Sequence, residues 1–161
     1  MKLLYLYLAA AALPVLAMPA GAADRFTIDP QHAFPSIEFS HMGLSVWRGK
    51  FDKSSGDITL DRDGKSGTVD IAIDPASVNF GVDAMDEKAR SEDFFNVKQY
   101  PAATYRGTLK FSGGELKAVE GEVTLLGVTR PVTLTVNSFR CMPHPMLKKA
   151  VCGAGKVRRE R

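Results

Sequence analysis

Apolar and polar residues alternate with a period of two over most of the chain. In an early stretch, Ile37 and Phe39 share one face and Glu38 lies on the other, and residues 47–51 alternate in the same way. This period is typical of strands that place one face on a core. Residues 42–45 between the two runs are short enough to form a turn. We therefore predict two strands joined by a tight turn, and we expect the remaining chain to complete their enclosure.

The same alternation recurs further along the chain. It is found at residues 26–28, 57–61, 69–74, 104–111, 119–125 and 132–136. Gly56 either bends one long strand or ends it. Short connections with turn residues favour antiparallel pairing. A sheet with one apolar face must curl onto itself or pack on another sheet. The pattern therefore predicts an all-β, antiparallel fold.

One segment, residues 75–101, departs from the strand pattern and predicts a short helical excursion. Asp83 is a candidate N-cap, with Asp86 in the first turn. The apolar side of this helix would consist of Val82, Met85 and Ala89. Phe94 and Phe95 follow it. They would either plug one end of a barrel, as a lid, or simply pack the connection over the sheet.

Residues 1–22 have the features of a secretory signal. A single positive charge precedes an apolar run at 3–16, and small residues at 20–22 suit cleavage after Ala22. The alternative is a membrane anchor, which Pro14 and Pro19 disfavour. We expect residues 1–22 to be a signal peptide and the protein to reach the periplasm. Residues 23–155 would then form one domain, followed by a basic tail at 156–161.

The charge and the cysteines fit this expectation. The sequence pI is about 8.9, but the basic excess lies in the tail KVRRER rather than in a basic face, so we expect no nucleic-acid partner. In an oxidising compartment, Cys141 and Cys152, eleven positions apart, favour a disulfide over free thiols. Closing such a loop stabilises a fold by about 3 kcal/mol. His144 alone does not complete a zinc ligand set, and we expect no metal.

The chain resembles the YceI-like family of exported, lipocalin-like proteins. The resemblance covers about residues 24–155 and rests on the order and spacing of several motifs. These are DPQH at 29–32, FSHMG at 39–43, GKF at 49–51, RSEDFF at 90–95, YPAA at 100–103 and GEVTLLGVTRPV at 121–132. The resemblance implies an antiparallel β-barrel whose lumen holds a long polyisoprenoid of the quinone or prenyl-phosphate type. It also implies a periplasmic binding protein without catalysis and without a cofactor.

The chain departs from the family pattern in two places. Lys88 and Ala89 stand where the family often has His-Leu, which weakens any head-group role there. Residues 155–161 stand where the family continues with two further strands. We therefore expect a barrel that is incomplete at its C-terminal end, in which the strand at 132–139 pairs only with a short piece at 150–153. A truncated, non-functional family member is one alternative to the binding protein.

An isoprenoid tunnel requires an unbroken apolar lining. The inward-facing candidates are Phe34, Ile37, Phe39, His41, Trp47, Phe51, Ile58, Val69, Ile71, Phe94, Leu109, Phe111, Val123, Leu125 and Leu134. Each could instead be an ordinary core residue, since a barrel of this size either fills with side chains or holds one small ligand. Gly49, Gly107 and Gly121 would leave room on the inward faces, or mark bulges.

Two histidines are candidates for contact with a polar head group. His32 and His41 would lie on inner strands, where a hydrogen-bonded structural role is the other reading. A lipid-modifying enzyme that uses both histidines together with Glu38 is the enzymatic alternative. The expected partners are a polyisoprenoid lipid and, transiently, a membrane.

Overall fold

The computed structural model describes residues 23–146 and 149–159, so the expected signal peptide lies outside the described residues. Strands dominate, with one α-helix and one short 3₁₀ turn. The elements in chain order are β1 Asp24–Thr27, β2 Ser36–His41, β3 Ser45–Phe51, β4 Ser54–Asp61, β5 Ser66–Ile73, η1 Pro75–Ser77, β6 Val78–Asn79, α1 Asp83–Arg90, β7 Ala103–Ser112, β8 Glu115–Leu125, β9 Val128–Pro143 and β10 Ala150–Arg159. The predicted all-β fold with one helical excursion is confirmed.

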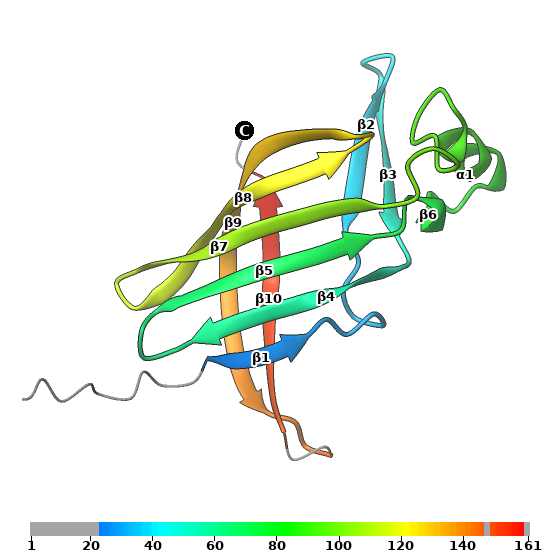
Figure 1. Ribbon diagram of the computed structural model, residues 1–161. Helices are drawn as coiled ribbons and strands as arrows, with labels where there is room; N and C mark the ends of the chain where they lie inside the picture. Colours follow the sequence, from blue (N-terminus) through cyan, green and yellow to red (C-terminus); the bar gives the residue numbers. More distant parts are fainter. Residues whose placement is uncertain (1–22, 147–148, 160–161) are drawn as a thin grey trace, which may run out of the picture.

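Seven strands form one antiparallel sheet in the order β1-β4-β5-β7-β8-β9-β10. Figure 1 shows β9 and β10 crossing behind the strands β1, β4, β5 and β7, so the sheet curls strongly around one side. Short turns join most neighbours, as the alternating pattern with turn residues requires. The apolar faces of the strands meet on the inner, concave side, and the sheet is a nearly closed barrel.

The two outer strands of this sheet, β1 and β10, do not pair with each other within the described residues. Arg62 lies between them. Its Nε is 3.6 Å from a carboxylate oxygen of Asp24 in β1, and its Nη2 donates to the Sγ of Cys152 in β10 at 3.5 Å. A single side chain thus spans the opening that remains between the first and last strands of the sheet.

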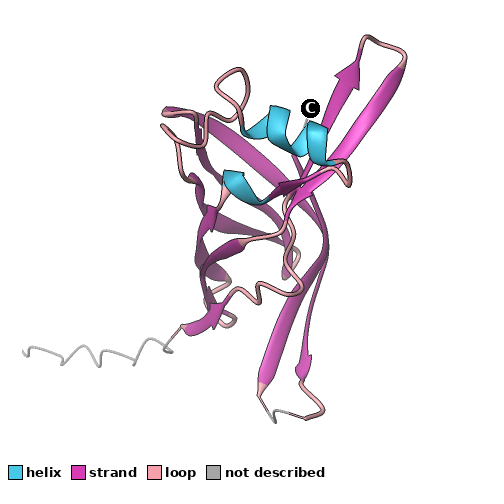
Figure 2. Cartoon of the chain, turned by 90° about the vertical axis from the view of Figure 1, so that its right-hand side faces the viewer, coloured by secondary structure: helices cyan, strands magenta, loops and turns pink. Residues whose placement is uncertain are grey.

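A second, three-stranded sheet has the order β2-β3-β6. Phe39 pairs with Trp47 across the β2–β3 hairpin, and residues 42–44 form its turn, one residue shorter than the predicted 42–45 because Ser45 begins β3. The sequence did not show whether Gly56 bends one strand or ends it. In the structure Gly56 lies within β4, and the preceding strand ends earlier, before residues 52–53, where the chain passes into the large sheet. Figures 1 and 2 show that the hairpin projects from the body of the molecule.

Helix α1 begins at Asp83, and its N-cap is Val82, which provides no side-chain hydrogen bond. The prediction that Asp83 caps the helix is therefore wrong. Asp83 lies one position further on, in the first turn, where a carboxylate still interacts favourably with the helix dipole. Asp86 is buried and accepts a 2.7 Å hydrogen bond from the backbone N–H of Phe80, which ties the helix to the chain after β6.

The C-terminal pairing is longer than predicted. Strand β10 pairs with β9 from Ala150, opposite Pro143, to Arg159, opposite Leu134, with register shifts around Lys156. The prediction that only a short piece at 150–153 pairs with β9 is therefore wrong. The physical reason is the length of β9, because β8 pairs with β9 only as far as Thr135 and leaves the remainder of β9 to β10 alone.

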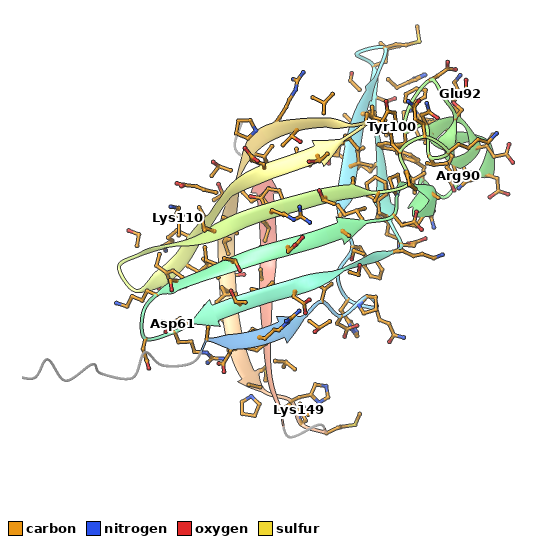
Figure 3. The ribbon with its side chains drawn as sticks, viewed as in Figure 1. Asp61, Arg90, Glu92, Tyr100, Lys110 and Lys149 are labelled. Carbon is orange, nitrogen blue, oxygen red and sulfur yellow. A yellow bond between two sulfur atoms is a disulfide. The ribbon has the colours of Figure 1, made fainter. Side chains whose placement is uncertain are left out.

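Charged side chains lie on the outer side of the large sheet. Arg106 pairs with Asp70 and Lys110 with Glu120, each at 3.1 Å, across neighbouring strands. Figure 3 shows Lys110 of this sheet pointing away from the body. Such exposed pairs contribute little stability individually, but they keep this face polar. No helix among the described residues is long and apolar enough to cross a bilayer.

Candidate functional site

The inner side of the seven-stranded sheet carries the larger of two apolar clusters, which we call the concave-face cluster. Its buried members are Leu60, Val69, Tyr105, Leu109, Leu116, Val119 and Val136, and its partly buried members are Phe26, Ile58, Ile71, Phe111, Val123, Val132, Leu134 and Phe139. Many of these inward apolar side chains thus keep some accessible surface. The protein itself does not completely cover this face.

A cavity of about 430 Å³ opens on the concave-face cluster. Five members of the cluster line it, namely Leu60, Phe111, Leu116, Val136 and Phe139. Its other lining residues are Arg62, Gly114, Glu115, Lys117, Asn137, Ser138 and Cys141, so apolar and polar groups share the lining. The volume falls within the range of about 300–1,000 Å³ that is usual for ligand sites.

Tyr105 places one polar group within this apolar wall. Its hydroxyl is 3.0 Å from the carbonyl oxygens of both Val119 and Val132. Burial raises the pKa of the Tyr105 phenol above its ordinary value, so the neutral form is favoured. Through this side chain, β7 is linked to the carbonyls of β8 and β9. The role of Tyr105 is thus to hold the wall together.

A second cluster, the hairpin cluster, lies between the β2–β3 hairpin and the segment around α1. Its buried members are Phe51, Val78, Ala89 and Phe95, and Ile37, Phe39, Ile73, Phe80 and Val97 pack against them. Phe51 and Phe95 meet edge to face at 5.5 Å between ring centroids, and Phe39 lies 5.9 Å from Phe80. Phe95 therefore packs the connection over the hairpin.

The predicted lining is divided between these two clusters. Ile58, Val69, Ile71, Leu109, Phe111, Val123 and Leu134 lie in the concave-face cluster, whereas Ile37, Phe39 and Phe51 lie in the hairpin cluster. The structure therefore does not bring all the candidates into one lining. The division arises because β3 ends at Phe51 and the chain enters the other sheet at Ser54.

Several candidates are exposed. Phe34 precedes β2 and lies under the ammonium group of Lys50, 4.3 Å from the ring centroid. Leu125 lies on the same strand face as Val123 but is 36% exposed, because it ends β8 directly before the turn into β9. Phe94 is also exposed and meets Phe39 edge to face at 6.3 Å. Trp47 is half-buried and lies edge-on to the exposed His41.

The glycines do not leave the room that the sequence suggested. A methyl group at Gly49 would lie 2.7 Å from the ring of Phe80, so that aromatic side chain already occupies the space. Gly107 and Gly121 face each other across β7 and β8, and a methyl group at Gly121 would lie 2.1 Å from the carbonyl oxygen of Arg106. These glycines allow close approach of protein atoms rather than space for a ligand.

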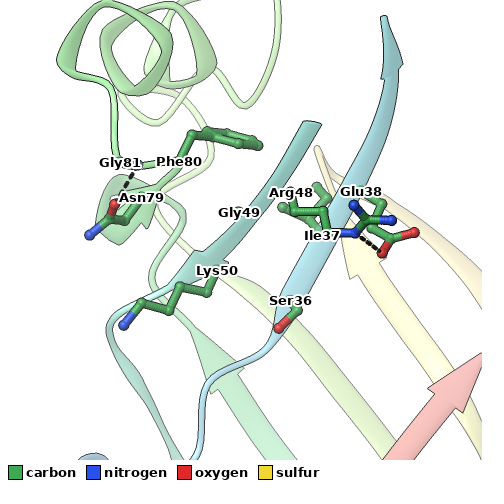
Figure 4. A pocket seen from close by; sticks show the side chains of 9 residues that line it. All are labelled: Ser36, Ile37, Glu38, Arg48, Gly49, Lys50, Asn79, Phe80 and Gly81. Atoms are coloured by element: carbon green, nitrogen blue, oxygen red, sulfur yellow. Dashed lines mark hydrogen bonds and ion pairs between the residues drawn. The ribbon is translucent and has the colours of Figure 1, made fainter. Parts of the chain in front are cut away.

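An open groove of about 460 Å³ lies beside the hairpin (Figure 4). It is lined by Ser36, Ile37, Glu38, Arg48, Gly49, Lys50, Asn79, Phe80 and Gly81. Two interactions organise it: Arg48 Nε donates to Glu38 at 2.9 Å, and the N–H of Gly81 donates to the side-chain oxygen of Asn79 at 2.8 Å. Its charged groups already have partners, and it is separate from the concave-face cluster.

The candidate histidines do not converge. His32 lies in an exposed turn rather than on an inner strand, and its Nδ1 is 2.8 Å from Asp29. Hydrogen bonds from the N–H of Gln31 and from His32 lower the pKa of the Asp29 carboxyl. His41 lies at the end of β2, on the face opposite Glu38, which pairs with Arg48. The arrangement of these three residues gives no support to the enzymatic alternative.

The disulfide predicted from export and spacing is present. Cys141 in β9 and Cys152 in β10 lie opposite each other in the register and are bonded. The bond ties the outermost strand of the large sheet to its neighbour close to the cavity, which Cys141 borders.

Sequence reasoning missed part of the lining. Tyr105 and Val119 fall on apolar faces in the alternating pattern, but neither was chosen as a candidate. Leu60, Leu116 and Val136 were missed as well, although each is buried in the concave-face cluster. The signal that could have identified these residues was their position on the apolar face of a strand. Phe80 follows β6 in the helical excursion, where no alternation indicates a face.

The fold and the two clusters define a small antiparallel β-barrel protein with an apolar interior. Comparison with known proteins is more specific. The YceI-like domain model matches residues 26–161, and the chain belongs to this family, as its motifs predicted. It is 37% identical to Protein YceI of Escherichia coli O6:H1 over 137 residues, which cover 83% of this chain and 71% of that protein.

Solved structures agree on the fold. The crystal structure of Burkholderia cenocepacia BcnA matches with a TM-score of 0.59 and 27% identity, covering 69% of this chain and 72% of that one. A YCEI protein of Campylobacter jejuni matches with a TM-score of 0.54 and 18% identity, covering 84% of this chain and 98% of that one. The second likeness concerns the fold alone.

Proposed function

We propose that this protein is a binding protein for a long-chain polyisoprenoid, of the quinone or prenyl-phosphate type, which lies along the concave-face cluster. The observation that carries the proposal is the unfilled apolar wall: five of its side chains border a cavity of about 430 Å³. Membership of the YceI-like family supports the ligand class, since the family resemblance implies an isoprenoid. A water-filled cavity against such a wall is less favourable than one filled by a hydrocarbon chain.

Energetics indicate where selectivity must arise. Burying one methylene gains about 0.8 kcal/mol relative to water, so an eight-unit prenyl chain gains roughly 30 kcal/mol gross. This exceeds the roughly 20 kcal/mol limit of observed affinities, and the competing state is a membrane rather than water. Net affinity therefore depends on the shape of the wall and on a few polar contacts. The charged groups at the cavity are Arg62, which pairs with Asp24, and Lys117, which pairs with Glu115, so any polar contact with a head group has to be shared with these ion pairs.

Export to the periplasm is a further part of the proposal. It is supported by the signal-like sequence of residues 1–22 and is consistent with the Cys141–Cys152 disulfide, a bond that persists in oxidising compartments. Cell fractionation of the full chain tests it. Recovery of a processed form in the periplasmic fraction is expected, and an unprocessed form confined to the cytoplasm would contradict it.

Mass spectrometry of the organic extract of purified protein tests the ligand class. We expect an isoprenoid in stoichiometric amount, released when the protein is unfolded. Delipidated protein should then take up a polyprenyl phosphate or a long-chain quinone, but not a straight-chain fatty acid of similar length. Extracts with no isoprenoid, together with no uptake of either probe, would contradict the proposal.

A further inference from the structure

The turn of the β2–β3 hairpin exposes a compact group of large apolar side chains, which we call the hairpin tip. Met42 is 81% exposed, Leu44 85% and Val46 48%. Figures 1 and 2 show the tip at the far end of a hairpin that projects from the body. Isolated exposed hydrophobic residues are normal, but three within five positions at a projecting tip indicate a contact surface.

The tip is uncharged. No Asp, Glu, Lys or Arg occurs from Phe39 to Trp47. The nearest charged residues, Glu38 and Arg48, pair with each other at 2.9 Å, and Lys50 pairs with Asp52 at 2.8 Å. The tip can therefore leave water without the cost of desolvating a carboxylate, ammonium or guanidinium group, and the two ion pairs beside it are charge-balanced.

The backbone of the tip satisfies much of its own hydrogen bonding. The N–H of Leu44 donates to the carbonyl of His41 at 3.0 Å, and Ser45 pairs with His41 in the ladder. Gly43, with φ of +74°, accommodates the turn. A closed turn of this kind can enter an apolar phase at small cost, because polar backbone groups without partners are what a hydrocarbon environment excludes.

Aromatic rings lie directly behind the tip. Trp47 is half-buried and is 6.2 Å from the ring of His41. Rings with an apolar body and a polar N–H are favoured at the boundary between hydrocarbon and water. The order along the hairpin is thus an apolar end, then aromatic rings, then the Glu38–Arg48 ion pair, which is the order of polarity across one side of a bilayer.

We propose that the hairpin tip inserts into the surface of a phospholipid bilayer and docks the protein there. A convex, projecting end without a groove suits a fluid lipid layer better than the shaped surface of a protein partner. Binding comes from insertion of Met42 and Leu44 and needs no anionic lipid, because Arg48 and Lys50 are already paired. The role of docking, access to a membrane-resident ligand, rests on the proposed function; the insertion does not.

Trp47 is the sole tryptophan of the chain and reports directly on the tip. The test uses the delipidated full chain and vesicles of zwitterionic phosphatidylcholine that contain no isoprenoid, with and without bromine on the acyl chains. We expect the Trp47 emission to shift to shorter wavelength on vesicle addition and to be quenched by the brominated lipid. Raising the salt concentration should change binding less than twofold.

The M42S/L44S double variant should reduce the vesicle partition coefficient about a hundredfold, roughly tenfold for each side chain withdrawn from hydrocarbon. The matched control is M142S/M146S, which changes two exposed methionines at the β9–β10 end and should partition like the wild type. Because all four positions are exposed, the variants should fold, which circular dichroism checks.

Unquenched Trp47 in the wild type, or equal loss of partitioning in both double variants, would overturn the proposal. A dimer of the tip is the alternative outcome. If the wild type is dimeric, does not bind vesicles and becomes monomeric in the M42S/L44S variant, a second copy covers the tip and the proposal is overturned as well. The lipid content of the purified protein does not enter this test. Failure of the proposed ligand and failure of membrane docking are therefore distinguishable.

Discussion

Tyr105 provides the sharpest test of a single residue in the wall. Tyr105→Phe removes the hydroxyl that lies 3.0 Å from the carbonyls of Val119 and Val132 while keeping the ring. We expect the free energy of unfolding to fall by about 1 kcal/mol, since the hydroxyl has one proton to share between the two carbonyls and a hydrogen bond contributes about 1 kcal/mol net. Chemical denaturation followed by circular dichroism measures the change.

Tyr100→Phe is the matched control. Tyr100 is half-buried, and no hydrogen bond of its hydroxyl is seen among the described residues. This variant should therefore keep nearly the wild-type stability. Equal losses in both variants would show that the Tyr105 hydroxyl does not link the strands β7, β8 and β9.

Leu109 and Leu125 were both predicted to face inward, but we expect different effects when each is replaced by Asp. Leu109 is 7% exposed within the concave-face cluster, whereas Leu125 is 36% exposed at the end of β8. Leu109→Asp should cost at least about 3 kcal/mol, because it buries an unpaired charge and removes packing. Leu125→Asp should cost about 1 kcal/mol or less.

Thermal unfolding and lipid content distinguish the pair of variants. We expect loss of bound isoprenoid with Leu109→Asp and retention with Leu125→Asp. If the second variant were as damaging as the first, Leu125 would belong to the lining after all.

The alternating pattern correctly placed Val69, Leu109 and Val123 within the concave-face cluster. At strand ends, as at Leu125, alternation gives the face but not the burial, because little of the molecule continues past the residue to cover it. It also gave no information on Phe80, which occupies the space above Gly49 from a segment without strand periodicity. A contact of this kind joins segments that are distant in the sequence, so the local pattern of apolar and polar residues cannot predict it.

At the scale of elements, the edge strand β1 is held to β4 partly through Asp57. The carboxylate of Asp57 accepts hydrogen bonds from Arg25 at 2.8 Å and from Thr27 at 3.0 Å. These bonds, that from Arg25 first, lower the pKa of Asp57 below its ordinary value near 4. A lowered pKa in the folded state contributes stability above that pH, and this contribution is lost as the pH falls through the folded-state pKa.

Asp57→Asn removes the titrating group at nearly constant size. The variant should have a lower melting temperature than the wild type near neutral pH, and the difference should shrink as the pH falls below about 4. Melting curves of both proteins across this range measure it. A difference that is independent of pH would mean that the ionised form of Asp57 does not hold β1.

The disulfide should stabilise the β9–β10 pair. Cys141 and Cys152 enclose a loop with a sequence separation of 11, and in the chain-entropy model such a closure is worth about 3 kcal/mol. The C141S/C152S variant should lose about this much stability, and the reduced wild type should lose it as well. Hydrogen exchange should increase most strongly in β10. Exchange that is unchanged in β10 would contradict this role.

The sequence predicted the existence and type of most elements, because each strand has one apolar face and turn residues separate them. It predicted less of β10, whose residues 150–159 alternate poorly and pair only because β9 extends past β8. It also did not show that the first hairpin and the large sheet would form separate clusters, which depends on how distant segments meet.

At the scale of the molecule, the chain forms a curled sheet whose outer strands β1 and β10 remain unpaired with each other among the described residues, with Arg62 between them. Unpaired strand edges favour association, and we therefore expect the protein to associate through this open edge. The concave-face cluster and its cavity are the features on which the proposed function depends. The family motifs anticipated the barrel, but they did not indicate that half of the expected lining lies in the hairpin cluster or at the surface.

Photoaffinity labelling tests the central claim most directly. A polyisoprenoid that carries a photoreactive group on its chain is bound to the delipidated protein, and the complex is irradiated. Peptide mass spectrometry then identifies the labelled residues. The account predicts labels on the half-buried residues that border the cavity, Phe111 in β7 and Phe139 in β9, and further along the concave-face cluster on Ile58, Ile71, Val123 and Leu134. Unlabelled isoprenoid should compete for them. Labels confined to the hairpin cluster, or to the outer side of the sheet around Arg106 and Lys110, would contradict it.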